Sequence, residues 1–161
     1  MQQFNFKNNK LNLRVKKSPL GVRIVMFFLA FASFILPVFG TIWGLSLGGG
    51  LDIGYFIGIG LFSVIGFYLL RIALWNTYGE ETIEILKNRI TYEANYNWFK
   101  DGKKEMAITV PSYSFKSVGY EEDNEGVLVI SSENVQMESV VKMPMEQIES
   151  LLFILKPVAN S

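Results

Sequence analysis

The chain has 161 residues, half of them apolar, and its formal net charge is zero. It contains no Cys and no His, which excludes disulfides, zinc sites built on thiolate or imidazole, thiol chemistry and a Ser-His-Asp mechanism. The charge is unevenly placed: residues 1–23 carry six basic and no acidic residues, whereas residues 76–161 carry eight basic and fourteen acidic residues. Because neutralised phosphates supply most of the affinity for nucleic acid, we expect no nucleic-acid partner for the acidic part.

A basic segment, residues 1–19, begins the chain. Between Phe4 and Val15, apolar and polar residues alternate on both sides of Asn8-Asn9, a pair that tolerates positive φ. The pattern predicts a small β-hairpin that pairs with the C-terminal sheet. A disordered basic tail is the alternative interpretation.

Two apolar runs, Ile24–Leu47 and Ile53–Trp75, dominate the next part of the sequence. A helix that spans a bilayer needs about 20 mostly apolar residues. The first run has no ionisable side chain and the second has one, Arg71. The sequence therefore predicts a transmembrane helical hairpin over residues 20–78, with Asp52 in the short connection capping the second helix.

Charge predicts the orientation of this hairpin. The basic residues gather before the first run, and the connection between the runs holds no Lys or Arg. The positive-inside rule then places the connection outside and both termini in the cytoplasm. We expect a multi-pass protein of the cytoplasmic, or inner, membrane.

Glycines recur at every fourth position, at Gly40, Gly44 and Gly48 in and directly after the first run and at Gly54 and Gly58 in the second. Helix backbones approach closely along such a stripe. We expect the two helices to pack on each other through these glycines. Formation of a homo-oligomer through one stripe is the alternative.

Residues 79–161 show strand signals and then a helical period. Arg89–Trp98 places Ile90, Tyr92, Ala94, Tyr96 and Trp98 on one face, and Lys100-Asp101-Gly102-Lys103 has the chemistry of a tight turn. Six strands are predicted: Thr82–Leu86, Arg89–Trp98, Lys104–Val110, Tyr113–Tyr120, Val127–Ser132 and Val135–Lys142, with a turn near Glu133-Asn134. Met145–Leu155 has helical spacing between Pro144 and Pro157.

This order of elements resembles a pleckstrin-homology-like domain, in which a helix closes one open end of two antiparallel sheets. The whole chain resembles the small bacterial membrane proteins that carry such a domain behind a two-helix hairpin. The matching features are the basic start, the hairpin, Glu80–Ile85, the turn at Lys87-Asn88-Arg89 and the final helix. The predicted class is a membrane-anchored α+β protein, but the six clear strands fall one short of the seven that the family has.

Three groups of side chains are candidates for binding. Basic residues gather around the first two predicted turns and form a possible anion-binding cluster: Lys87, Arg89, Lys100, Lys103 and Lys104. The acidic loop Glu121–Glu125 has oxygen ligands that calcium accepts, but it lacks the EF-hand pattern, so we expect no metal site and no cofactor. Tyr92, Tyr96, Trp98 and Phe99 are interpreted as sheet core and membrane-facing rim.

No constellation of residues indicates catalysis. The resemblance implies a non-enzymatic interaction or scaffolding module that is anchored in the bacterial inner membrane. Its expected partners are the lipid bilayer and a protein, bound through a sheet edge or beside the helix. An immunity-type protein that guards the membrane against a toxin is the alternative function.

Overall fold

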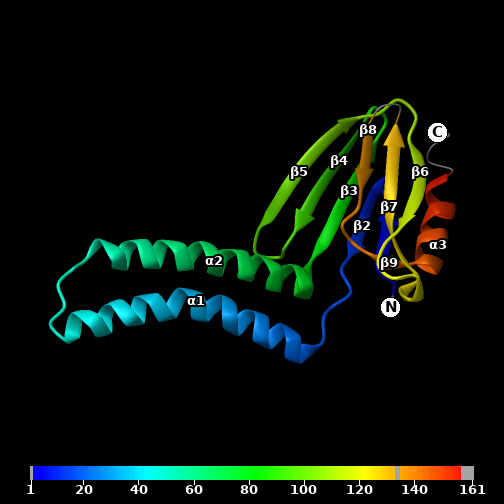
Figure 1. The fold of residues 1–161 in the computed structure, drawn as a ribbon. Helices are drawn as coiled ribbons and strands as arrows, with labels where there is room; N and C mark the ends of the chain where they lie inside the picture. The colour runs from blue at the N-terminus through cyan, green and yellow to red at the C-terminus, as the bar shows by residue number, and fades with distance from the viewer. Residues whose placement is uncertain (1, 133–134, 157–161) are drawn as a thin grey trace. The chain divides into compact units, whose positions relative to one another are not determined.

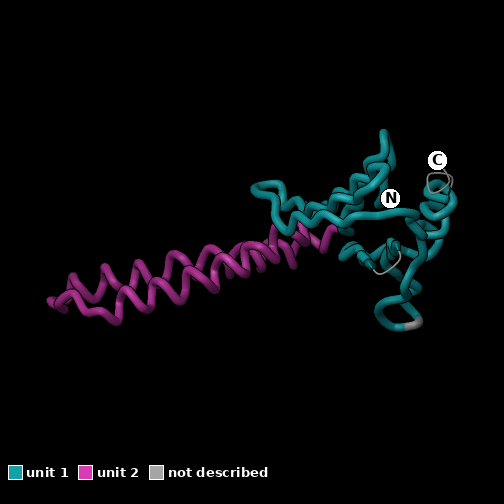
Figure 2. Tube along the Cα trace, turned by 90° about the horizontal axis from the view of Figure 1, so that it is seen from above, with its two compact units in different colours: residues 1–16, 78–161 teal, residues 17–77 magenta. Residues whose placement is uncertain are grey.

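The fold is that of a computed structural model that describes residues 2–132 and 135–156. It has two long apolar helices, two antiparallel sheets and a C-terminal helix (Figure 1). The chain divides into two compact units, one formed by Met1–Lys16 with Tyr78–Ser161 and the other by Lys17–Thr77 (Figure 2). The predicted turn at Glu133-Asn134 and the helix stop at Pro157 lie outside the described residues.

The first sheet has five antiparallel strands in chain order, and its first two strands form the predicted N-terminal hairpin. The strands are β1 (Phe4–Lys7), β2 (Lys10–Arg14), β3 (Glu80–Leu86), β4 (Arg89–Asn95) and β5 (Lys100–Ala107). Asn8 and Asn9 connect β1 to β2 with φ values of 52° and 60°, the left-handed pair that a two-residue turn requires. Strand β2 pairs with β3, so the hairpin joins the sheet as the alternation predicts.

The turn between β4 and β5 is not where the Asp-Gly pair predicts it. Tyr96 to Phe99 form the turn, and Asn97 has the positive φ of 72°. Gly102 also has positive φ, but it lies within β5, where Gly102 and Lys103 together oppose Glu93. The Asp-Gly chemistry therefore makes a β-bulge, which uses the same backbone conformation as a tight turn.

The second sheet packs with the C-terminal helix. Its strands are β6 (Ser112–Ser117), β7 (Glu125–Ser132), β8 (Val135–Glu138) and the two-residue β9 (Met143–Pro144), and α3 (Met145–Leu155) follows; a short 3₁₀ helix, η1 (Glu121–Asp123), precedes β7. Leu128 and Ile130 of β7 and Ile148 and Leu151 of α3 are fully buried. Gly126 lets α3 approach, because a Cβ there would lie 2.9 Å from Ile148 Cδ1.

The last predicted strand, Val135–Lys142, is interrupted. Strand β8 ends at Glu138, the Ser139 N–H still donates to the Leu128 carbonyl of β7 at 2.8 Å, and regular pairing with β7 resumes at Met143. The four residues between them form a bulge, with Ser139 and Val141 buried and Val140 exposed. Ser139 Oγ accepts the Leu128 N–H at 2.9 Å, so part of the lost ladder is replaced by a side chain.

The second unit contains α1 (Leu20–Ser46) and most of α2 (Ile53–Tyr78). Both helices are long and apolar enough to cross a membrane, and most of their large apolar side chains are exposed. Asp52 Oδ1 accepts the Gly54 N–H at 2.6 Å, which confirms the predicted cap. Helix α2 continues through Asn76 and Thr77, and both side chains donate to carbonyls four residues earlier.

The glycines contact aromatic rings and not one another. A Cβ at Gly44 would lie 2.5 Å from Tyr55 Oη, and one at Gly66 would lie 2.9 Å from the Phe34 ring. Gly40, Gly48 and Gly58 have no such neighbour within 4 Å, and Gly54 meets Asp52 of its own turn. Of the predicted stripe, only Gly44 lies at the helix–helix contact, whereas Gly66 was not predicted.

The helical hairpin is inserted between two paired strands. Strand β2 ends at Arg14 and β3 begins at Glu80, yet these two residues are register partners. The Val15 N–H donates to the Gly79 carbonyl at 2.9 Å, so the pairing continues one step past the strands. The chain therefore leaves the sheet and returns to it at one point.

Candidate interaction surface at the free sheet edge

Strand β1 forms one edge of the five-stranded sheet. The two-residue turn after β1 makes Lys7 and Lys10 a hydrogen-bonded pair. Along an antiparallel ladder, hydrogen-bonded pairs alternate with pairs whose backbone groups point away from the partner strand. The Arg14 N–H donates to the Gln3 carbonyl at 2.7 Å, which fits this phase. The N–H and C=O groups of Phe4 and Phe6 therefore point away from β2, toward the outer edge of the sheet.

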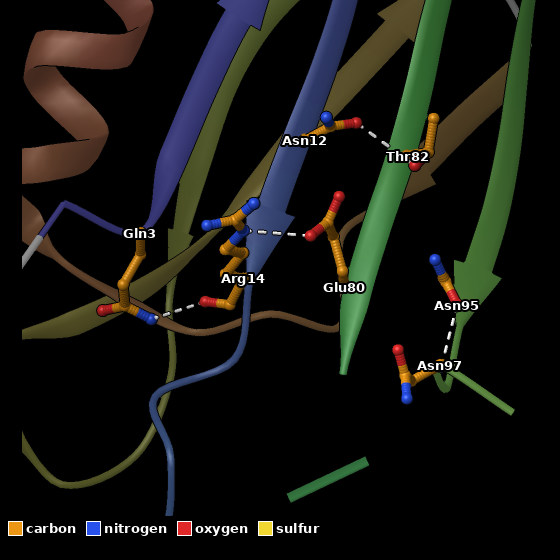
Figure 3. A network of polar contacts seen from close by, with 7 residues as sticks. All are labelled: Gln3, Asn12, Arg14, Glu80, Thr82, Asn95 and Asn97. Atoms are coloured by element: carbon orange, nitrogen blue, oxygen red, sulfur yellow. Dashed lines mark hydrogen bonds and ion pairs between the residues drawn. The ribbon is translucent and has the colours of Figure 1, made fainter. Parts of the chain in front are cut away.

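Gln3 fixes the start of this edge. Its Nε2 donates to the Arg14 carbonyl at 3.0 Å (Figure 3). The same Nε2 donates to the Lys142 carbonyl at 3.0 Å, and the backbone N–H donates to Gln147 Oε1 of α3 at 2.8 Å. The Gln3 side chain is buried. One residue thus ties β1 to α3, to β2 and to the segment before β9.

A surface groove of about 370 Å³ runs along this edge. Phe4 is buried beneath it and Phe6 is partly buried, while Ile154 of α3 is exposed. The groove is lined by Gln2, Gln3, Phe4, Asn5, Phe6, Asn12, Arg14 and Ile154. The edge thus offers backbone hydrogen-bonding groups beside polar side chains, with Phe6 and Ile154 as the accessible apolar groups of the groove, a combination that suits an added strand.

The outer face of the same sheet is polar, and its charges pair with one another. Arg14 Nε lies 2.9 Å from Glu80, and Thr82 Oγ1 donates to Asn12 Oδ1 at 3.2 Å (Figure 3). A second groove, of about 260 Å³, lies on this face. It is lined by Lys10, Thr82, Glu84, Leu86, Arg89, Thr91, Glu93, Lys103 and Glu105, which is three basic and three acidic residues. Such a balanced surface offers little to a strongly charged ligand.

The structure does not bring the five predicted anion-binding residues together. Lys87 and Arg89 lie at the β3–β4 turn, whereas Lys100 lies at the other end of β4, opposite Asn95. Lys100 pairs with Glu93 at 2.7 Å and Lys103 with Glu105 at 3.2 Å. Lys104 lies opposite Tyr92, between the two turns. Successive turns of a meander lie at opposite ends of the sheet, which sequence proximity conceals.

The acidic loop folds onto itself. Asp123 Oδ2 accepts the Tyr120 N–H at 3.2 Å within η1, and Asn124 takes the left-handed conformation after it. Among the described residues, no three acidic side chains are grouped so that they could hold a metal ion.

The sequence interpretation missed one buried carboxylate, Glu81. Its Oε1 accepts from Tyr92 Oη at 2.8 Å and from the Val140 N–H at 2.7 Å, and its Oε2 accepts from the Val141 N–H at 3.2 Å. Glu81, Ile83 and Ile85 are alternate residues of β3 and all face inward. This two-residue alternation in the sequence could have predicted that Glu81 is buried.

Burial raises the pKa of the Glu81 carboxyl, and its three hydrogen bonds act in the opposite direction. Burial, reinforced by the neighbouring carboxylate, also raises the pKa of the Tyr92 phenol. Glu81 lines neither of the two grooves described above. We therefore interpret the network as a structural link between the two sheets.

Comparison of the chain with protein-family models, with curated proteins and with solved structures gives no match.

Proposed function

We propose that this chain is a two-pass, membrane-anchored interaction module without enzymatic activity, located in the bacterial inner membrane with both termini in the cytoplasm. The apolar surface of α1 and α2 supports the membrane location. Phe28, Leu36 and Ile53 are each more than half exposed. Because apolar surface in water costs about 25 cal/mol per Å², lipid is the more favourable surrounding for such helices.

The observation that carries the topology is the insertion of the hairpin between β2 and β3. Strands that pair as neighbours lie on one side of a membrane, so the two ends of the inserted helices belong to the same side. The basic residues before α1 and the absence of Lys and Arg from residues 47–52 support the cytoplasm as that side.

The strand count supports a pleckstrin-homology-like domain. Strands β2 to β8 provide seven strands in two antiparallel sheets, and α3 packs against β6 and β7. The N-terminal hairpin supplies the strand that the sequence interpretation lacked, and β1 is an addition at the edge. In this proposal the membrane hairpin is an insertion within the domain and does not precede it.

The β1 edge is the proposed binding site. An extended segment of a partner protein would pair with the backbone of Phe4 and Phe6 and place apolar side chains beside Ile154. Photo-crosslinking in native membranes tests this site. A crosslinking side chain in place of Asn5, which lines the groove, is expected to give a discrete protein adduct, whereas one at exposed Gln136 of β8 is expected to give none.

Two variants of Phe6 distinguish the effect of blocking strand pairing at the edge from the effect of losing the aromatic ring. Phe6→Pro removes an N–H that points away from β2 and obstructs a strand at the edge, so it is expected to abolish the Asn5 adduct. Phe6→Ala removes the ring without obstructing the edge and is expected to retain the adduct. Absence of an Asn5 adduct in the parent chain, or its survival in Phe6→Pro, would overturn the proposed site.

A further inference from the structure

The β4–β5 turn presents an exposed tryptophan on a rigid support. The Tyr96 N–H donates to the Phe99 carbonyl at 2.9 Å, and the Asn97 N–H donates to Asn95 Oδ1 at 2.8 Å (Figure 3). The Tyr96 and Phe99 rings stack with centroids 4.7 Å apart. Tyr96 is buried, but Trp98 is 59% exposed, although the alternation placed both on one face. The turn reverses the alternation and directs the largest side chain outward.

The strand register gives the location of this turn. Arg14 pairs with Glu80, Glu80 with Asn95, and Asn95 with Lys100, so these four residues form one row across the sheet. The turn continues past this row. Helix α2 ends at Tyr78, and Gly79 alone separates it from β3. Trp98 therefore lies at the end of the sheet where the chain passes into and out of the apolar helices.

The charges at this end suit a lipid surface. Glu80 is paired with Arg14 and Glu93 with Lys100. Lys16 and Lys17 follow the Arg14–Glu80 pair and are exposed. Lysines this close to a bilayer attract anionic headgroups, and the tryptophan ring, which is apolar with one N–H donor, favours the headgroup region.

We propose that Trp98 lies in the headgroup region of the bilayer, so that the β4–β5 turn fixes the sheet unit against the membrane surface. This inference rests on the proposed membrane insertion of α1 and α2. It assigns the turn a lipid ligand and gives the exposed Trp98 ring an apolar surrounding. The opposite end of β4, at Asn88, has no exposed aromatic residue in its turn.

Fluorescence quenching of the full chain tests the proposal. The chain has three tryptophans, so Trp43→Phe with Trp75→Phe leaves Trp98 as the sole emitter, and Trp75→Phe with Trp98→Phe leaves Trp43 within α1. A third variant replaces all three by Phe and carries Asn88→Trp as the matched control. Each is reconstituted in vesicles of zwitterionic and anionic phospholipid, with and without bromine on the acyl carbons nearest the headgroup.

The expected result is a blue-shifted Trp98 emission that brominated lipid quenches and aqueous acrylamide does not. The Asn88→Trp emission is expected to respond to acrylamide only. If Trp43 is quenched by brominated lipid but Trp98 behaves like Asn88→Trp, the headgroup contact is wrong and the membrane anchor stands. If Trp43 is not quenched by any brominated lipid, including lipid brominated deep in the chains, the anchor itself is wrong.

Discussion

At the scale of single residues, Glu81 joins the two sheets. It belongs to β3 of the first sheet, and its carboxylate accepts two consecutive backbone N–H groups, those of Val140 and Val141, from the segment that joins β8 to β9 of the second sheet. The interruption of the last predicted strand has its cause here, because these N–H groups turn toward Glu81 and not toward β7. The alternation within Val135–Lys142 cannot predict this interruption, because the acceptor lies some sixty residues away in the chain.

Replacement of Glu81 by Leu is expected to destabilise the sheet unit. The apolar side chain has similar size but leaves Tyr92 Oη and the N–H groups of Val140 and Val141 without their acceptor. An unpaired buried donor costs about 1–3 kcal/mol, so a substantial loss of unfolding free energy is expected. The measurement is thermal unfolding in detergent, followed by near-ultraviolet circular dichroism. Glu84→Leu, on the exposed face of the same strand, is the matched control and is expected to change stability little.

The same pair of proteins gives a pH test. Because burial raises the pKa of Glu81, the folded state binds this proton more tightly than the unfolded state does. The resulting stabilisation is complete below the ordinary pKa of 4.5 and is lost as the pH rises through the raised pKa. The advantage of the parent chain over Glu81→Leu should therefore shrink as the pH rises. An advantage that grows with pH would contradict the direction of the shift.

At the scale of elements, the sequence predicts periodic segments well and their contacts poorly. The N-terminal hairpin, the two apolar helices, β7 and α3 follow from period and turn chemistry. The Asp-Gly pair was misplaced because its positive φ suits a bulge as well as a turn. The glycine stripe was misassigned for a related reason. The spacing identifies helix faces without side chains, but the partner helix determines which of these faces lies in the helix–helix contact.

Gly66→Val is expected to separate α1 from α2, because its Cβ would lie 2.9 Å from the Phe34 ring. The matched control is Gly58→Val on the same helix, where nothing lies within 4 Å. Resistance of the helices to unfolding by dodecyl sulfate, measured by far-ultraviolet circular dichroism, is expected to fall for Gly66→Val and not for Gly58→Val. Equal effects would show that helix propensity, and not the ring contact, is responsible.

At the scale of the whole molecule, composition predicts a hairpin of two apolar helices but not its position within the fold. The chain order, with the hairpin before the larger sheet region, indicated an anchor followed by a domain. The N-terminal alternation predicts that the first strands join the later sheet, but only the pairing of β2 with β3 shows which strand they join. This pairing depends on residues far apart in the chain, because Leu11 and Leu13 of β2 are fully buried in the core.

The proposed topology is tested by labelling, because the chain has no native Cys. Leu51→Cys lies in the connection between the helices, and Asn88→Cys lies at an exposed turn of the sheet. A membrane-impermeant maleimide is expected to label Leu51→Cys in intact cells and Asn88→Cys only after permeabilisation. Labelling of Asn88→Cys in intact cells would place the sheet unit outside and refute the cytoplasmic orientation.

The insertion of the helices between two paired strands also has a consequence for biosynthesis. The ribosome releases β2 more than sixty residues before its partner β3, and closing so long a loop in a free coil carries an entropic cost that grows with its length. In the proposed topology, entry of both helices into the bilayer closes that loop, because one residue separates the end of the second helix from β3. On that proposed topology, insertion lowers the entropic cost of pairing β2 with β3, because the bilayer brings the two ends of the loop to the same surface.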